Sequence, residues 1–286
     1  MSASILVTGA SGAIGGAVTG ALAAAGQPVA PTARSASLVG GLTARYLDYD
    51  DPGCYAAALS GITSVFLVMP SGDPHSPERV APFVRAAAGA GVRHIVVNSA
   101  IMASVDEHFT LRRIERLVES CGTGWTHLRS AWYMSSLTSG IFAPMLAAGE
   151  LALPTGTSRC AFVDPDDFAA AAVAVLTSPT AHDGAVYTLT GPEAVDWPTA
   201  VRLCAHHLGR PMRYRAVSEE EYGEACRRAG VPEESVDLLL GLFAAGRDGR
   251  TACVQPDLRR LIARRPRTLA EFLADVGARE HAAGVG

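Results

Sequence analysis

The chain has 286 residues, of which 49% are hydrophobic and 18% charged, so it can bury a substantial core in one large domain or in a main domain with a smaller lobe. Its formal net charge of −4 argues against a nucleic-acid surface, and we expect neither a signal peptide nor a membrane span, because no apolar run is long enough. The six widely spaced cysteines contain no C-x-x-C pair, which indicates free thiols in a reducing compartment. We therefore predict a cytoplasmic protein. We predict no metal site, and neither nucleic acid nor a membrane as a partner.

The first fifteen residues predict a strand followed by a glycine-rich turn. Residues 4–8 are short, apolar and rich in β-branched side chains, as in a buried parallel strand. Gly9, Gly12 and Gly15 then follow with G-x-x-G-x-x-G spacing, and 13–26 has the pattern of a helix. A strand, a glycine turn and a helix in this order aim backbone N–H groups at a pyrophosphate.

This turn predicts dinucleotide binding. Gly9 allows the tight turn, Gly12 the close approach of the phosphates, and Gly15 the close packing of helix on strand. Ser11 offers a hydroxyl to a phosphate oxygen. The predicted cofactor-binding residues of the turn are Gly9, Ser11, Gly12, Ala13 and Ile14. A glycine-rich turn in an α/β domain without a cofactor is the alternative.

The end of the second predicted strand indicates which dinucleotide is bound. Residues 27–32 lead into Ala33, Arg34 and Ser35, where this fold faces the adenosine ribose. An acidic residue there would bind the 2′-hydroxyl of NAD, whereas an arginine suits the 2′-phosphate of NADP. Arg34 therefore predicts NADP(H), with NAD less favoured. A solvated arginine at the end of a strand is the alternative.

Three further strands supply the remaining residues of the predicted cofactor site. They are the short runs 44–47, 64–69 and 94–98. Ligands of parallel sheets bind outside the carboxyl ends of the strands, so we expect residues at these ends to face the cofactor. These residues are Met69, Pro70, Ser71, Asn98 and Ser99. The loop with Asp48 and Tyr49 either contacts the adenine or forms a turn and helix cap.

Alternation of strands and helices continues through a helix at 107–121 and a strand at 124–129, which predicts an α/β fold with a Rossmann-like, doubly wound parallel sheet. A helix at 135–148 follows. The pattern then changes, so we predict an NAD(P)-binding domain at 1–150 and a smaller α+β substrate lobe at 151–286. Strands near 161–164 and 185–189 could return to the first domain. The arginine-rich run at 259–267 is predicted to be a solvated helix face.

Several motifs in this order resemble the NmrA-like branch of the atypical short-chain dehydrogenases, which includes the type 2 NAD(P)H:quinone oxidoreductases. The motifs are TGASGAIG at 8–15, AR at 33–34, His-x₆-Glu from His108 to Glu115, THLRS at 126–130, VDPDDFAAA at 163–171 and VYTLTGPEAV at 186–195. They cover nearly the whole chain. The resemblance implies a Rossmann-like domain that binds NADP(H), with substrate between it and the C-terminal lobe.

The chain departs from the wider superfamily in its catalytic residues. Those enzymes use a Tyr-x-x-x-Lys pair, whereas the corresponding helix here has Glu107 and Leu111 at that spacing. All 24 basic residues are arginine, so the pair cannot exist anywhere in this chain. His108, predicted on one helix face with Arg112, is a candidate general acid, with a solvated histidine as the alternative.

Aromatic side chains after the sixth strand predict the substrate site. Tyr133 could donate its phenolic proton to a carbonyl, or Trp132 and Tyr133 could be pocket walls that stack on a flat ring. Phe142 and Phe162 are further candidates for an apolar pocket.

We predict a reductase of secondary metabolism that transfers hydride from NADPH to a quinone, enone or aromatic ketone, with the proton from solvent. The partner is a small, flat molecule, and a homodimer is one option for the oligomeric state. One alternative is a non-catalytic NADP-binding redox sensor. Another is a biosynthetic isomerase, cyclase or dehydratase on the same fold.

Overall fold

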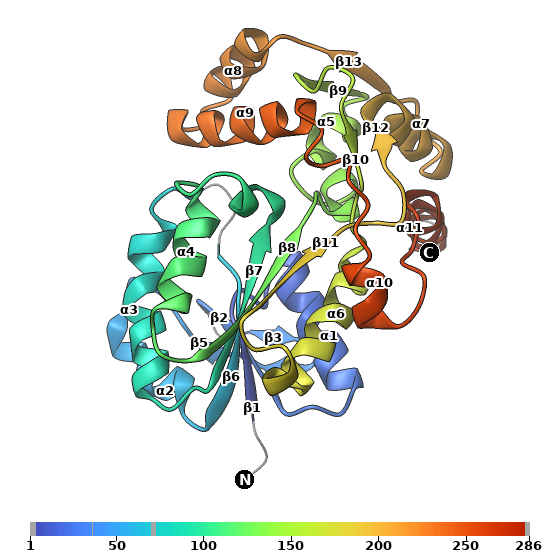
Figure 1. Ribbon diagram of the computed structural model, residues 1–286. Coiled ribbons are helices and arrows are strands. Elements are labelled where there is room, and N and C mark those ends of the chain that lie inside the picture. Colours follow the sequence, from blue (N-terminus) through green and yellow to red (C-terminus); the bar gives the residue numbers. More distant parts are fainter. Residues whose placement is uncertain (1–3, 36, 70–72, 284–286) are drawn as a thin grey trace. The chain divides into compact units, whose positions relative to one another are not determined.

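The computed structural model describes residues 4–35, 37–69 and 73–283, which belong to two compact units (Figure 1). Unit 1 comprises Met1–Ser130, Pro165–Leu189 and Arg260–Ala263. Unit 2 comprises Ala131–Asp164, Thr190–Arg259 and Arg264–Gly286. Unit 1 therefore draws on three separate parts of the chain.

Unit 1 is built on a seven-stranded sheet of order β11-β8-β7-β6-β1-β2-β5, in which every pairing is parallel. Its strands are β1 (Ser4–Val7), β2 (Val29–Ala33), β5 (Arg45–Tyr46), β6 (Ile62–Leu67), β7 (His94–Ala100), β8 (Gly124–Ser130) and β11 (Ala185–Leu189). The chain runs from β1 outward through β2 to β5, then returns to the other side of β1 with β6. The predicted doubly wound, Rossmann-like sheet is confirmed, and its topological switch point lies between β1 and β6.

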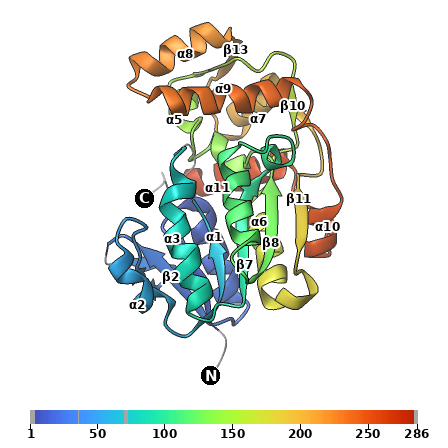
Figure 2. The same cartoon turned by 60° about the vertical axis from the view of Figure 1, so that its left-hand side comes forward.

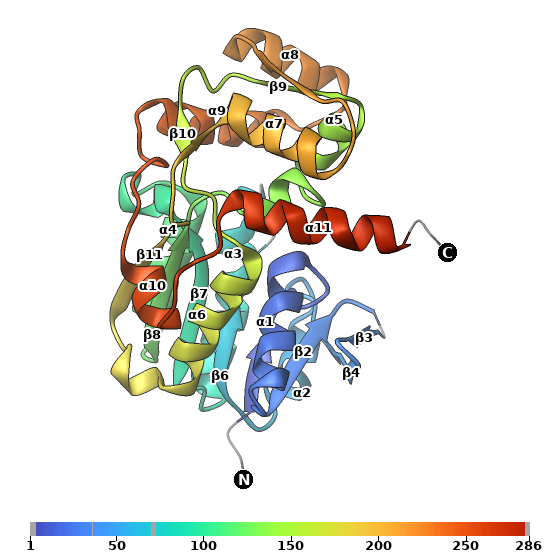
Figure 3. The ribbon, with the colours of Figure 1, turned by 90° about the vertical axis from the view of Figure 1, so that its right-hand side faces the viewer.

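Helices cover both faces of this sheet. Helices α1 (Ala13–Ala24) and α6 (Pro165–Thr177) lie side by side on one face, as Figure 3 shows. Phe168 of α6 meets Phe66 of β6 there, with 6.2 Å between ring centroids. The other face is covered by α2 (Tyr55–Leu59), α3 (Ser76–Gly89) and α4 (Thr110–Glu119). The unit also contains the short helices η1 (Pro52–Cys54), η2 (Ile101–Ser104) and η4 (Pro179–Ala181).

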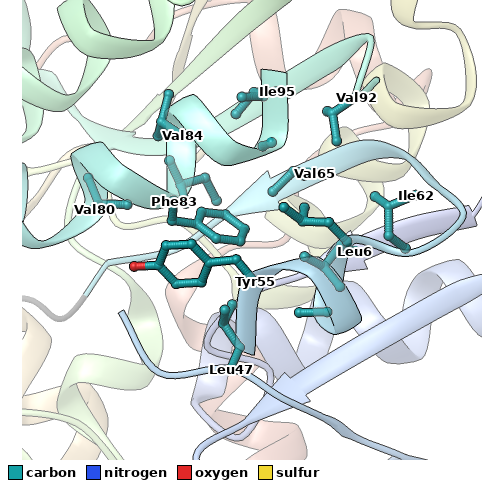
Figure 4. Packing of buried hydrophobic residues seen from close by; sticks show 14 of the residues in the cluster. Leu6, Leu47, Tyr55, Ile62, Val65, Val80, Phe83, Val84, Val92 and Ile95 are labelled. Carbon is teal, nitrogen blue, oxygen red and sulfur yellow. The ribbon is translucent and has the colours of Figure 1, made fainter. Parts of the chain in front are cut away.

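The core beneath α2, α3 and α4 is formed by alternate residues of the central strands, which are buried on both faces. Leu6 of β1, Val65 of β6 and Ile95 of β7 belong to one buried cluster with Tyr55 and Phe83 (Figure 4). The two rings meet edge to face, with 5.5 Å between their centroids. Burial of each large apolar side chain contributes about 1.5–3 kcal/mol. This packing fixes the strands whose ends carry the candidate site.

Unit 2 contains shorter sheets and an aromatic core. Its elements are η3 (Met134–Leu137), α5 (Ala143–Ala147), β9 (Glu150–Leu153), β10 (Arg159–Cys160), β12 (Val195–Asp196), α7 (Trp197–His207), β13 (Arg213–Ala216), α8 (Glu219–Arg228), α9 (Glu233–Arg247) and α11 (Leu269–Ala283), some visible in Figure 2. Strand β13 pairs in parallel with β9, and β10 pairs with β12 antiparallel. Helix α10 (Asp257–Ile262) includes residues of both units. Phe142, Trp197 and Phe243 are buried and in ring contact.

Local structure differs from the sequence-based expectation at several places. The helix expected at 135–148 is divided into η3 and α5, and residues 44–47 contribute only β5. A hairpin of β3 (Leu38–Val39) and β4 (Leu42–Thr43) precedes β5, and its turn is made by Gly40 and Gly41, both at positive φ. Residues 161–164 form one bridge, from Val163 to Tyr133, instead of a strand. Among the described residues, no helix combines the length and apolarity needed to span a membrane.

Candidate functional site

The glycine turn lies at the carboxyl end of β1, beside the switch point. Gly9 has φ of +58°, and its carbonyl accepts a hydrogen bond from the Gly12 N–H at 3.0 Å. The Thr8 hydroxyl accepts a hydrogen bond from the Val68 N–H at 2.7 Å. Since Val68 directly follows β6, this bond ties the ends of β1 and β6 together.

Close backbone contact brings the start of α1 onto this turn. A Cβ atom on Gly15 would lie 2.3 Å from the carbonyl oxygen of Gly9, a distance that no folded protein tolerates. A Cβ atom on Gly12 would lie 3.3 Å from the same oxygen. The close packing of α1 on the turn therefore requires glycine at position 15, and the turn itself has Gly9 at positive φ. Both roles agree with the spacing of the sequence motif.

The turn and the helix start form an open cradle of backbone N–H groups. Gly9, Ser11, Gly12 and Ala13 are exposed, and Ile14 is half-buried. Among the described residues, no side chain caps the first turn of α1, and that turn contains no acidic residue. Uncapped N–H groups and a helix N-terminus attract a phosphate, so this cradle fits the pyrophosphate of a dinucleotide.

Other predicted cofactor residues follow neighbouring strands. Arg34 comes directly after β2 and is exposed. Met69, two residues after β6, is buried. Asn98 is half-buried near the end of β7. Pro70 and Ser71 lie outside the described residues. The turn, Arg34, Met69 and Asn98 thus all lie toward the carboxyl ends of parallel strands, while their roles toward a cofactor remain predictions.

Ser99 is also predicted to bind the cofactor, but its hydroxyl forms a hydrogen bond within unit 1. The hydroxyl donates to Oε1 of Glu115 at 2.7 Å. The Glu115 carboxylate is fully buried and also accepts two bonds from Arg129, Nε at 2.9 Å and Nη2 at 2.6 Å. Arg112 Nη1 donates to Oε2 at 2.9 Å. One carboxylate therefore joins β7, β8 and α4.

This buried network extends to a histidine. Arg112 also donates to Glu119 at 2.6 Å, and Glu119 lies 3.1 Å from Nε2 of the fully buried His127. Burial lowers the pKa of His127, although Glu115 and Glu119 oppose the shift. Glu115, Glu119 and His127 are close enough to share a metal ion. Two arginines already neutralise the two carboxylates, however, which favours an ion-pair network over a metal site.

Sequence reasoning missed this network as a unit. Glu115 and Arg129 are 14 positions apart and on different elements, although each falls in a motif that resembles the family. The network depends on the register of β7 against β8, which places Ser99 opposite Arg129 and which a single sequence does not contain.

His108 does not lie on a helix, so the predicted helix start at 107 is wrong. Helix α4 begins at Thr110, and the His108 N–H donates instead to Oδ1 of Asp106 at 2.8 Å. His108 is exposed, while Arg112 is on the helix and bound to glutamates. The two residues therefore do not share a helix face, and a catalytic role of His108 remains a prediction.

The predicted substrate residues belong to unit 2. Trp132 is half-buried, with its ring 5.1 Å from that of Phe142 and stacked on Phe243 at 6.0 Å. Tyr133 is half-buried and forms the isolated β-bridge to Val163. Phe162 is only 2% exposed and packs edge to face on Trp197. Trp132 and Tyr133 thus offer surface to a ligand, whereas Phe162 lies within the aromatic core.

Unit 2 also contains an open cavity of about 390 Å³. It is lined by Leu137, Thr138, Ser139, Gly140, Ala143, Pro144, Leu146, Ala147, Leu208, Arg210 and Met212. Besides apolar side chains, its wall carries two hydroxyl groups and one guanidinium. Trp132, Tyr133 and Phe162, although all described, do not line it.

Known proteins are similar to this chain along nearly its whole length. The model of the NmrA-like family matches residues 1–273. The NAD(P)H azoreductase of Xenophilus azovorans is 32% identical, with 99% of each chain covered. The (4-alkanoyl-5-oxo-2,5-dihydrofuran-3-yl)methyl phosphate reductase of Streptomyces griseus subsp. griseus is 37% identical, over 95% of this chain and 97% of its own. The crystal structure of an NADPH-dependent quinone oxidoreductase from Escherichia coli, complexed with NADPH, has a TM-score of 0.81 and 25% identity, covering 95% of this chain and 99% of its own.

Proposed function

The chain belongs to the NmrA-like family, and from that premise we propose that it is an NADPH-dependent oxidoreductase that reduces a small quinone, enone or aromatic ketone. The observation that carries the proposal is the open cradle of N–H groups at the switch point, with Arg34 at the end of the adjacent strand. The named relatives, which are reductases, and the NADPH complex of the similar structure support it.

The residues of unit 1 bind and orient the dinucleotide. Uncapped N–H groups of α1 and the Ser11 hydroxyl hold the pyrophosphate, and the Arg34 guanidinium holds the 2′-phosphate. NADPH, when bound, supplies the hydride. Because the chain has no lysine, proton delivery by a Tyr/Lys pair is excluded, and we assign the proton to solvent.

The acceptor class is inferred from chemistry that the relatives' names share. An azo group, an unsaturated lactone and a quinone all contain a conjugated double bond that accepts hydride. Trp132 and Tyr133 are the described aromatic residues that we propose for stacking on such a planar group.

Oxidation of NADPH, followed at 340 nm with a panel of quinones, unsaturated lactones, azo dyes and aromatic ketones, tests the proposal. We expect turnover with at least one planar acceptor and much slower turnover with NADH. Tight NADPH binding without turnover across the panel would favour a second candidate, a non-catalytic redox sensor. One observation favours the sensor, namely that the helix after β7 contains no Tyr-x-x-x-Lys pair, because the chain contains no lysine.

Replacement of Arg34 by alanine tests the cofactor preference. We expect NADPH affinity to fall by about 10- to 100-fold, because one charge-assisted contact to the 2′-phosphate is lost. NADH affinity should change little. Fluorescence titration with both dinucleotides measures this, and Arg85→Ala, an exposed arginine of α3, is the matched control. Equal losses for the two dinucleotides would contradict the assignment of Arg34.

A further inference from the structure

Arg79, in the first turns of α3, joins two loops at the carboxyl edge of the unit 1 sheet. Its Nε and Nη2 atoms donate to the two carboxylate oxygens of Asp50, at 3.0 and 2.6 Å. Its Nη1 atom donates to Asp73 at 2.7 Å. Asp50 belongs to the loop after β5, and Asp73 to the segment that precedes α3. The guanidinium therefore binds Asp50 in a two-pronged arrangement that fixes the orientation of this carboxylate.

Asp50 follows β5, which pairs in parallel with β2, the strand that leads to Arg34, the arginine proposed for the 2′-phosphate. Hydrogen bonding from Arg79 lowers the pKa of the Asp50 carboxyl, and the charges of Arg79 and Arg34 lower it further. The Asp50 side chain is 61% exposed, so it is an accessible negative charge at the same carboxyl edge of the sheet as Arg34.

A free carboxylate at this position would oppose NADP. It would pair with Arg34 and repel the doubly charged 2′-phosphate. Arg79 counters both effects, because it occupies both oxygens of Asp50 and adds a positive charge.

We propose that Arg79 is a specificity-determining residue that maintains the preference for NADPH by holding Asp50 away from Arg34. This inference rests on the proposed binding of NADPH. Arg79 acts through Asp50 in this account, so its removal should change the ratio of the two dinucleotide affinities and leave the affinity for NADH itself largely unchanged.

Fluorescence titrations of Arg79→Ala, Asp50→Asn and the double variant with NADPH and NADH test the inference. We expect Arg79→Ala to lose up to about fivefold in NADPH affinity and to keep its NADH affinity. The double variant should recover NADPH binding to near the wild-type level, because the carboxylate that competes for Arg34 is gone. The inference would be overturned if Arg79→Ala lost equal affinity for both dinucleotides, or if the double variant did not recover NADPH affinity. Arg79 would then only connect the two loops structurally.

Asp50→Asn alone provides an independent test should Arg79→Ala fail to fold. It should bind NADPH at least as tightly as the wild type, and a selective loss of NADPH affinity would refute the inference. Thermal unfolding of each variant shows whether the fold is retained. If the wild type binds neither dinucleotide, both the proposed function and this inference fail. If the wild type prefers NADPH and the double variant does not recover, only this inference fails.

Discussion

Replacement of Gly15 by alanine is expected to abolish measurable NADPH binding. The added Cβ would lie 2.3 Å from the Gly9 carbonyl oxygen and 2.7 Å from the carbonyl carbon. Both are backbone atoms, so no side chain can rotate to make room, and either the turn or the start of α1 must move. We expect the affinity for NADPH to fall at least about a hundredfold, because the backbone N–H groups no longer point together at the pyrophosphate. We also expect the free energy of unfolding to fall by about 1–3 kcal/mol.

Gly20→Ala is the matched control in the same helix. Among the described residues, no atom lies within 4 Å of a Cβ at position 20, which is exposed. Alanine has the higher helix propensity, so this variant should gain up to about 1 kcal/mol of stability and bind NADPH normally. Titration and urea unfolding of both variants measure the contrast. Normal binding by Gly15→Ala would show that the close approach of helix and turn is dispensable.

Glu115→Gln is expected to cost about 3–5 kcal/mol of folding stability, the largest effect that we predict for a single charge. The carboxylate is fully buried and accepts bonds from Ser99, Arg112 and Arg129. A glutamine amide keeps the shape but turns an N–H group toward a guanidinium, and Arg129, whose side chain is 13% exposed, loses its counter-charge. Urea unfolding at pH 7 measures the loss.

Glu78→Gln is the control for this variant, because Glu78 forms an ion pair with Arg113 in which both side chains are exposed. Such pairs contribute little to stability. A similar small effect at position 115 would mean that the buried network is not important for folding.

The same carboxylate predicts a pH dependence. Burial alone would raise the pKa of Glu115, but hydrogen bonds from Arg129 and Ser99, with the charges of His127 and Arg129, lower it overall below the usual 4.5. A pKa lowered in the folded state gives stability that is fully present above pH 4.5 and is lost as the pH falls through the folded value. The difference in unfolding free energy between the wild type and Glu115→Gln should therefore be constant from pH 7 to 5 and shrink below pH 4.5.

The sequence predicted those features that depend on local constraints. Residues 4–15 combine a short apolar strand with glycines whose spacing allows one close-packed turn, and the structure contains this turn. The start of α4 was missed because Asp106 accepts the N–H of His108 and makes a separate turn before Thr110. Nothing in the helical periodicity of residues 107–121 distinguishes that turn from a first helical turn.

Contacts between distant residues could not be predicted. The network at Glu115 needs the register of β7 against β8, which opposes Ser99 to Arg129. The aromatic core of unit 2 likewise gathers Trp132, Trp197 and Phe243 from three separate segments. Such sites depend on tertiary packing. A single sequence shows which residue types are present, but not which distant residues meet.

The return of the chain to unit 1 has a consequence for synthesis on the ribosome. Residues up to Ser130 supply six strands of the sheet, but α6, which packs on α1, and β11, which pairs with β8, are translated only after residues 131–164. Until Leu189 has emerged, the nascent chain presents an open strand edge at β8 and a bare apolar surface around Phe66. Such surfaces promote aggregation and chaperone binding. The rate of translation through residues 131–189 should therefore influence how much folded protein a cell accumulates.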